Sequence, residues 1–284
     1  MSVNAKVTKV ITRDARELAY LYDLYVVPGW REVFDRIVDE EIEVPKEGKF
    51  LDAMCGTGGY ALDLSLRSGS KVSVIGVDPN EERLVLARGK ADVKKPNRVS
   101  FQQGSLQKLD FPIGEFDLVI GDLSLPPAMT PPTEIENALE ELIRVAKKGA
   151  TVVAKLTTQG SFGELFSLYW EALFESGLIE YSPEIERLIS ERLTTGEAEE
   201  LALDAGLRKI RSVTNNERFY FKDAEEFFTS PLIETSFLDD WFAFLPNQET
   251  RHHALEQLGK IIDRERQSAS FELSVKVTLL IGQK

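Results

Sequence analysis

The chain has 284 residues, 43% of them hydrophobic, and a net charge of −13. This length and composition allow a sizeable core in one domain with inserts. The surplus of carboxylates argues against a broad nucleic-acid surface, because phosphate binding requires clustered lysines and arginines. The single cysteine excludes an internal disulfide framework and is typical of a reducing cytosol.

The first residues of the chain, 1–20, contain no continuous apolar stretch of the kind found in secretory signals. No apolar run elsewhere approaches the ~20 residues that a membrane-spanning helix requires. We therefore expect a cytoplasmic protein without a membrane span, whose oligomeric state the sequence leaves open.

Residues 14–41 predict two helices that break at Pro28-Gly29. From there on, short apolar runs alternate with amphipathic helical segments. Such alternation predicts an α/β fold with a doubly wound, mainly parallel sheet covered on both faces. The runs are 49–55, 71–78, 99–104, 116–123 and 151–158.

The segment 133–148 shows the clearest helical pattern, with Thr133 and Glu136 as a capping box and Gly149 at its end. Further along, residues 160–192 and 194–207 read as helices and about 208–214 as a strand. An aromatic-rich stretch, a helix and a last strand at 271–282 follow. We interpret 1–284 as one domain: an N-terminal helical cap (1–45), a core (46–158), helical lids (159–193 and 222–266) and a final strand (267–284).

The stretch "FLDAMCGTGGY", residues 50–60, combines an acid on a predicted strand with a glycine-rich turn. The string Gly56-x-Gly58-x-x-Ala61 formally matches the dinucleotide-binding fingerprint. However, Asp52 would lie near the strand end, where a carboxylate repels a pyrophosphate and attracts an ammonium group. A ligand with an ammonium group, a ribose and little negative charge fits better, and S-adenosyl-L-methionine is such a ligand.

Four motifs in order resemble the class I S-adenosylmethionine-dependent methyltransferases, which have a Rossmann-like fold. "LDAMCGTGGYALDL" looks like the family's first motif, and "VIGVDPN" (74–80) is similar to the second. Residues 99–123 resemble the third and fourth, and 142–156 resemble its helix and fifth strand. The dipeptide Tyr22-Asp23 resembles the small-molecule branch of the family.

The resemblance implies that Asp52 lies near the methionine ammonium group and that Asp78 accepts hydrogen bonds from the ribose. Alternatives remain: Asp52 as a cap or loop acceptor, and Asp78 as a helix N-cap with Pro79 first in the helix. Where the family often has an aspartate for the adenine amino group, this chain has Ser105. The implied cofactor residues are Asp52, Ala53, Cys55, Gly56, Gly58, Asp78, Pro79, Ser105, Leu106, Asp122 and Leu123.

The methyl acceptor is expected to be a small, largely apolar organic molecule in an enclosed aromatic pocket. Core packing is the alternative for the late aromatic residues, and a turn-capping role is the alternative for Asp122 and Ser124. The predicted substrate residues are Tyr22, Trp30, Ser124, Phe221, Phe228 and Trp241.

No catalytic side chain or metal site stands out, since His252 and His253 are far from other plausible ligands. Cys55 is interpreted as a small buried residue. Three other functions stay open: a nucleic-acid base amino-methyltransferase, an NAD-dependent oxidoreductase and a non-catalytic cofactor binder. The first is suggested by "GDLSLPP" (121–127), whose spacing departs from that class, and the second is disfavoured by Asp52.

Overall fold

The computed structural model describes residues 13–95, 98–125, 132–266 and 269–284, and the chain divides into two compact units. The first, which we call the sheet unit, comprises residues 14–157, 193–214 and 277–284. Among the described residues, the second, the helical unit, comprises Arg13 and residues 158–192, 215–266 and 269–276. The predicted lids at 159–193 and 222–266 thus fall almost entirely in the helical unit.

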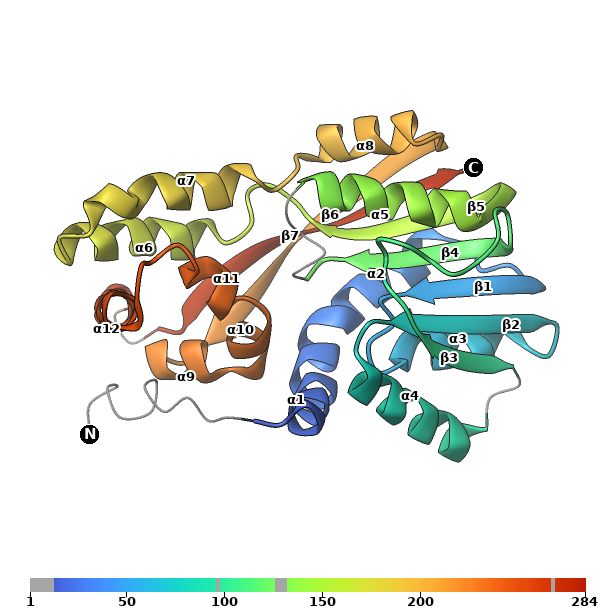
Figure 1. Ribbon diagram of the computed structural model, residues 1–284, viewed down its shortest axis with the longest axis horizontal. Helices are drawn as coiled ribbons and strands as arrows, with labels where there is room; N and C mark the ends of the chain where they lie inside the picture. Colours follow the sequence, from blue (N-terminus) through green and yellow to red (C-terminus); the bar gives the residue numbers. More distant parts are fainter. Residues whose placement is uncertain (1–12, 96–97, 126–131, 267–268) are drawn as a thin grey trace. The chain divides into compact units, whose positions relative to one another are not determined.

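A seven-stranded sheet has the order β3-β2-β1-β4-β5-β7-β6 (Figure 1). Neighbours among β1 to β5 run parallel, and β7 runs antiparallel to β5. The predicted doubly wound, mainly parallel sheet is therefore confirmed. Its strands are β1 (Gly48–Ala53), β2 (Val72–Asp78), β3 (Val99–Gln103), β4 (Phe116–Leu123), β5 (Ala146–Thr157), β6 (Arg208–Phe221) and β7 (Phe271–Gln283).

The two faces of the sheet have different partners, because successive side chains of a strand point to opposite sides. Leu51, Val119 and Val152 lie in one apolar cluster with α5 (Pro132–Val145) and α8 (Thr195–Asp204). On the other face, Lys155 contacts Tyr60 of α3 (Gly59–Ser68). The strand register places Asp52 and Asp122 on the same face as Lys155. Helix α4 (Glu81–Lys94) completes the sheet unit beside β2 and β3.

The predicted break at Pro28-Gly29 is wrong. Helix α1 (Ala15–Leu21), the π-helix η2 (Tyr22–Arg31) and α2 (Glu32–Glu41) follow one another without interruption, and Pro28 lies inside η2. Proline removes one backbone donor from a helix. Tyr22, Val26 and Trp30, spaced four residues apart, are all buried. The burial of this apolar side outweighs the missing hydrogen bond.

Two predicted boundaries are also corrected. Helix α5 ends at Val145 rather than at Gly149, because Gly114 and Glu115 donate to the last carbonyls, those of Arg144 and Val145. The helix begins at Pro132, so Thr133 lies within its first turn and not at the predicted cap. Strand β6 extends to Phe221, seven residues past the predicted end at about 214, because its side chains alternate between exposed and half-buried along this stretch.

The helical unit is built around aromatic side chains. Trp241 stacks on Phe237, with ring centroids 4.9 Å apart, and packs edge-on against Phe162 at 5.2 Å. Arg264 of α12 (Gln248–Glu265) donates hydrogen bonds to Glu171 and Glu175 of α6 (Gly163–Glu175), which joins these two helices. Its helices are α6 (Gly163–Glu175), η3 (Ile179–Tyr181), α7 (Ser182–Ser190), α9 (Ala224–Thr229), α10 (Pro231–Ser236), α11 (Leu238–Phe242) and α12 (Gln248–Glu265).

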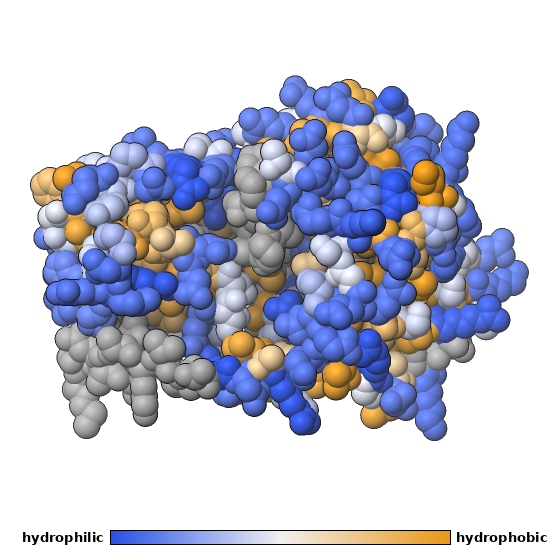
Figure 2. All heavy atoms as spheres, viewed as in Figure 1, coloured by the Kyte–Doolittle hydropathy of each residue, from blue (hydrophilic) through white to orange (hydrophobic). Residues whose placement is uncertain are grey.

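Hydrophilic residues predominate on the face seen in Figure 2, in keeping with a chain of which 29% is charged. None of the helices within the described ranges combines the length and the apolar character that a membrane crossing would need.

Candidate functional site

The glycine-rich turn connects β1 to α3 at the carboxyl end of the parallel sheet, where ligands of open α/β folds bind. Gly56 and Gly58 have φ angles of 59° and 74°, in the left-handed region that favours glycine. A Cβ on Gly56 would come within 2.9 Å of the Tyr22 ring. On Gly58 it would lie 2.6 Å from the Phe101 ring and 2.8 Å from Cβ of Ala87. Both positions therefore require glycine for the fold of the turn itself.

We expect Gly58→Ala to lower the free energy of unfolding by roughly 2–4 kcal/mol, from backbone strain and overpacking together. The measurement is urea unfolding followed by circular dichroism. Gly149→Ala is the control, because Gly149 has a similar φ of 83° but no atom lies within 4 Å of the place that a Cβ would take there. Equal losses in the two variants would contradict the steric argument.

Asp52 is the most unusual group at this end of the sheet. It is fully buried near the end of β1, and neither of its carboxylate oxygens has a hydrogen-bond partner in the part of the chain that the structure describes. Burial raises the pKa of Asp52 to about 6, although Lys155 and Arg31 act to lower it. An unpaired buried carboxylate is costly. An ammonium group, with three donors and a positive charge, would remove that cost.

Asp78 ends β2 and holds the glycine turn. Its Oδ2 accepts a hydrogen bond from the Gly56 N–H at 2.8 Å, and its Oδ1 accepts from the Asn80 N–H at 2.9 Å. The alternative in which Asp78 caps the next helix is wrong, because Asn80 is the N-cap of α4 and accepts from the Arg83 N–H. Pro79 precedes that cap. A carboxylate has about four acceptor sites, so Asp78 retains acceptor capacity for a ligand hydroxyl.

Asp122, at the end of β4, accepts hydrogen bonds, whereas Asp52 accepts none from the described residues. Its Oδ1 accepts from the backbone N–H and the hydroxyl of Ser124, at 2.9 and 2.6 Å, so the predicted turn-capping role is present. Trp30 Nε1 donates to Ser124 Oγ at 2.9 Å. Burial acts to raise the pKa of Asp122, but Arg31, Lys155 and the Ser124 donors outweigh it and hold the pKa below its usual value.

Tyr22 lies between two arginines. Arg31 Nη1 donates to the Tyr22 hydroxyl at 2.9 Å, and the Arg83 guanidinium lies 3.8 Å from the centre of the Tyr22 ring. Burial raises the pKa of the Tyr22 phenol, against the effect of both arginines. Arg31 in turn reaches Asp122, with 3.4 Å between Nη2 and Oδ2. The structure thus brings Tyr22, Trp30 and Ser124 together with Asp122.

Two buried cations at this site, Arg31 and Lys155, are absent from the sequence-based prediction. Lys155 is fully buried, forms an ion pair with Asp35 of α2, and lies 4.7 Å from the centre of the Tyr60 ring. Although burial acts to lower it, Asp35 and Asp122 hold the pKa of Lys155 above its usual value. The available signal was a lone lysine in the apolar run "TVVAKLTT", at a strand expected to be covered on both faces.

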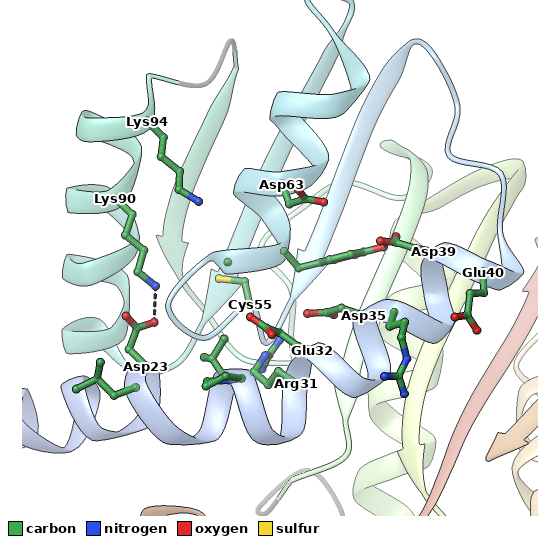
Figure 3. Close-up of a pocket in the computed structure, with 16 residues that line it drawn as sticks. Asp23, Arg31, Glu32, Asp35, Asp39, Glu40, Cys55, Asp63, Lys90 and Lys94 are labelled. Carbon is green, nitrogen blue, oxygen red and sulfur yellow. Dashed lines mark hydrogen bonds and ion pairs between the residues drawn. The ribbon is translucent and has the colours of Figure 1, made fainter. Parts of the chain in front are cut away.

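A pocket of about 950 Å³ lies beside these groups, between η2 and α2 on one side and α3 and α4 on the other. Figure 3 shows Asp23 of η2 joined to Lys90 of α4, with Asp35 and Asp39 of α2 along the wall. Of the predicted cofactor residues, Cys55 alone lines this pocket. The lining residues are Asp23, Leu24, Val27, Pro28, Arg31, Glu32, Asp35, Arg36, Asp39, Glu40, Cys55, Gly59, Tyr60, Asp63, Lys90 and Lys94.

The remaining predicted residues have plain structural surroundings. Ser105 is exposed, and its hydroxyl accepts from the Gln107 N–H, whereas Leu106 is buried in the cluster around α5. Ala53 and Leu123 are buried at the ends of β1 and β4. Phe221, Phe228 and Trp241 are buried in the helical unit, where ring contacts account for their aromatic character; a substrate role for them stays a prediction.

Part of the chain is similar in sequence to methyltransferases. Residues 50–149 match a family described as a methyltransferase domain. A demethylmenaquinone methyltransferase of Lactococcus lactis subsp. lactis is 34% identical over 124 residues, which are 43% of this chain and 48% of that protein. The chain spans about half the length of the curated relatives it matches.

Two solved structures share the fold. The YcgJ protein of Bacillus subtilis gives a TM-score of 0.58 at 18% identity, over 89% of this chain and 98% of that one. A phosphoethanolamine N-methyltransferase of Haemonchus contortus, solved with phosphomonomethylethanolamine and S-adenosylhomocysteine, gives 0.53 at 16% identity, over 96% and 60% of the two chains.

Proposed function

We propose that this chain is a class I S-adenosylmethionine-dependent methyltransferase that transfers a methyl group to a small, largely apolar organic acceptor, a proposal supported by the match of residues 50–149 to a methyltransferase domain. The observation that carries the proposal is Asp52, a buried carboxylate with no donor among the described residues. An ammonium group of the cofactor would compensate the negative charge of this carboxylate.

The other residues around Asp52 have roles that follow from their positions. Asp78, beside the glycine turn, would accept hydrogen bonds from ribose hydroxyls while it keeps Gly56 in place. The glycines let a ligand approach the main chain without an intervening Cβ. Ala53, Cys55, Pro79, Ser105, Leu106, Asp122 and Leu123 complete the proposed cofactor surface.

When bound, S-adenosylmethionine supplies an electrophilic methyl group on a sulfonium. The chain's own contribution is to bind and orient the two reactants and to exclude water, which can lower a barrier by several kcal/mol. Arg31 fixes the Tyr22 hydroxyl at 2.9 Å, and Asp122 and Trp30 fix Ser124, so the polar groups near the strand end are held by defined partners. The name of the relatives, demethylmenaquinone methyltransferase, supports an apolar acceptor for this chain as well.

Calorimetry with S-adenosylhomocysteine and NAD side by side tests the proposal. We expect S-adenosylhomocysteine to bind in the micromolar range and NAD to give no detectable heat, because Asp52 would oppose a pyrophosphate. Transfer of a radiolabelled methyl group to a short-chain quinol then separates an enzyme from a non-catalytic binder. Tighter binding of NAD than of S-adenosylhomocysteine would end the methyltransferase proposal.

A further inference from the structure

Arg192, which follows α7 in the helical unit, is a buried cation without an acidic partner among the described residues. The residue is 6% exposed. Nη1 donates to the Leu188 carbonyl, and Nε has no acceptor in the part of the chain that the structure describes. The guanidinium lies over two aromatic faces instead, 4.7 Å from the centre of the Phe162 ring and 5.4 Å from that of Phe166.

This arrangement differs from that of the other buried cations within the described residues. Arg31 pairs with Asp122 and Lys155 pairs with Asp35. A buried charge is normally paired, because removal from water is costly. Two aromatic faces and one carbonyl oxygen compensate the charge of a buried guanidinium only in part. Burial accordingly lowers the pKa of Arg192 to about 10, although Glu191 acts to raise it.

The surroundings of Arg192 are apolar and conformationally constrained. Phe162, the N-cap residue of α6, has a φ of 64°, a left-handed conformation that a bulky residue rarely adopts. Such strain concentrates at ligand-binding and active sites. Trp241 adjoins both rings under the guanidinium, with centroids 5.2 Å from Phe162 and 6.0 Å from Phe166. The immediate surroundings of the guanidinium are therefore aromatic rings that are themselves buried.

We propose that the helical unit holds an anion-binding site, in which Arg192 pairs with the carboxylate of an apolar, ring-containing organic ligand beside Phe162 and Trp241. The planar guanidinium offers two parallel donors to a carboxylate. The inference does not depend on the cofactor site, because every residue that carries it lies in the helical unit.

The test uses the full chain without cofactor and compares acids with their neutral amides: benzoate, 4-hydroxybenzoate and 2-naphthoate against benzamide, 4-hydroxybenzamide and 2-naphthamide. Calorimetry should show at least one acid bound tenfold or more tighter than its amide by the wild type. Arg192→Met should lose this preference. It should also keep or raise the melting temperature of the ligand-free protein, since it removes a buried, unpaired charge. Arg187→Met, on the exposed side of α7 where Arg187 pairs with Glu184 and Glu191, should keep the preference.

Two outcomes would overturn the proposal. One is a wild type that binds no acid of the three better than its amide. The other is an Arg192→Met protein that keeps the preference for the acid. If Arg192→Met fails to fold, the wild-type comparison still decides, supported by Arg192→Lys, which retains the charge and should retain a weaker preference. Absence of S-adenosylhomocysteine binding would refute the proposed function and leave this result untouched.

Discussion

Asp52→Asn is expected to weaken S-adenosylhomocysteine binding about 10- to 150-fold while it stabilises the ligand-free protein at pH 7.5. The loss of affinity corresponds to one charge-assisted interaction of about 1.5–3 kcal/mol. The gain in stability follows from burial, since the ionised carboxylate has no donor among the described residues and Asn carries no charge. Function and stability would therefore oppose each other at this position.

The pH dependence of the same site has a defined sign. The pKa of Asp52 is raised to about 6 in the folded protein, so the folded state holds this proton to higher pH than the unfolded state does. The stability that the proton contributes is fully present below the unfolded pKa and is lost as pH rises through about 6. A shift of two units corresponds to about 2–3 kcal/mol. Cofactor affinity should change in the opposite direction, and fall about tenfold from pH 7.5 to pH 5 as Asp52 takes up a proton.

Calorimetric titrations from pH 5 to 8, with urea unfolding at each pH, measure both effects. The Asp52→Asn protein should show little dependence of affinity on pH across this range. Asp239→Asn is the control, because Asp239 is an exposed residue of α11 that pairs with Arg251 and does not line the pocket beside the glycine turn. Unchanged affinity in Asp52→Asn, or a wild-type affinity that is flat below pH 7, would refute the role of this carboxylate.

The sheet could be predicted from sequence because its strands are short apolar runs separated by amphipathic helices, a pattern set by local burial. The helix through Pro28 could not, because it depends on tertiary burial of Tyr22, Val26 and Trp30, which outweighs a local breaker. The end of α5 at Val145 likewise depends on donors from Gly114 and Glu115, about 30 residues earlier in the chain.

At the site, the positions of Asp52 and Asp78 could be predicted, because both lie near the carboxyl end of a strand and beside the glycine turn. Lys155 and Arg31 were missed for a different reason. A lysine in an apolar strand has meaning only when its partner is known, and the partner, Asp35, lies 120 residues earlier on α2. Only the tertiary structure brings three buried or nearly buried aspartates together with two cations. The group consists of Asp35, Asp52, Asp122, Arg31 and Lys155.

Lys155→Met is expected to lower the free energy of unfolding by about 3–5 kcal/mol, the usual effect of removing one member of a buried ion pair. Met matches the lysine stem in length and fills the same space, so the loss reports the charge and not a cavity. When Lys155 is replaced, Arg31 is the one buried cation that remains beside Asp35, Asp52 and Asp122 among the described residues. Urea unfolding at pH 7.5 measures the loss.

The same substitution should move the pH at which cofactor affinity falls to a higher value. Lys155 is the strongest of the groups that lower the pKa of Asp52, so its removal makes Asp52 harder to ionise. Lys147→Met is the matched control on the same strand, because Lys147 pairs with Asp117 where both side chains are partly exposed, and it should cost about 0–1 kcal/mol. The double variant Lys155→Met/Asp35→Asn also neutralises Asp35, the carboxylate that loses its partner. It should therefore regain part of the lost free energy of unfolding. If Lys155→Met matches Lys147→Met in stability and the pH midpoint of binding does not move, Lys155 is not the group that keeps Asp52 ionised.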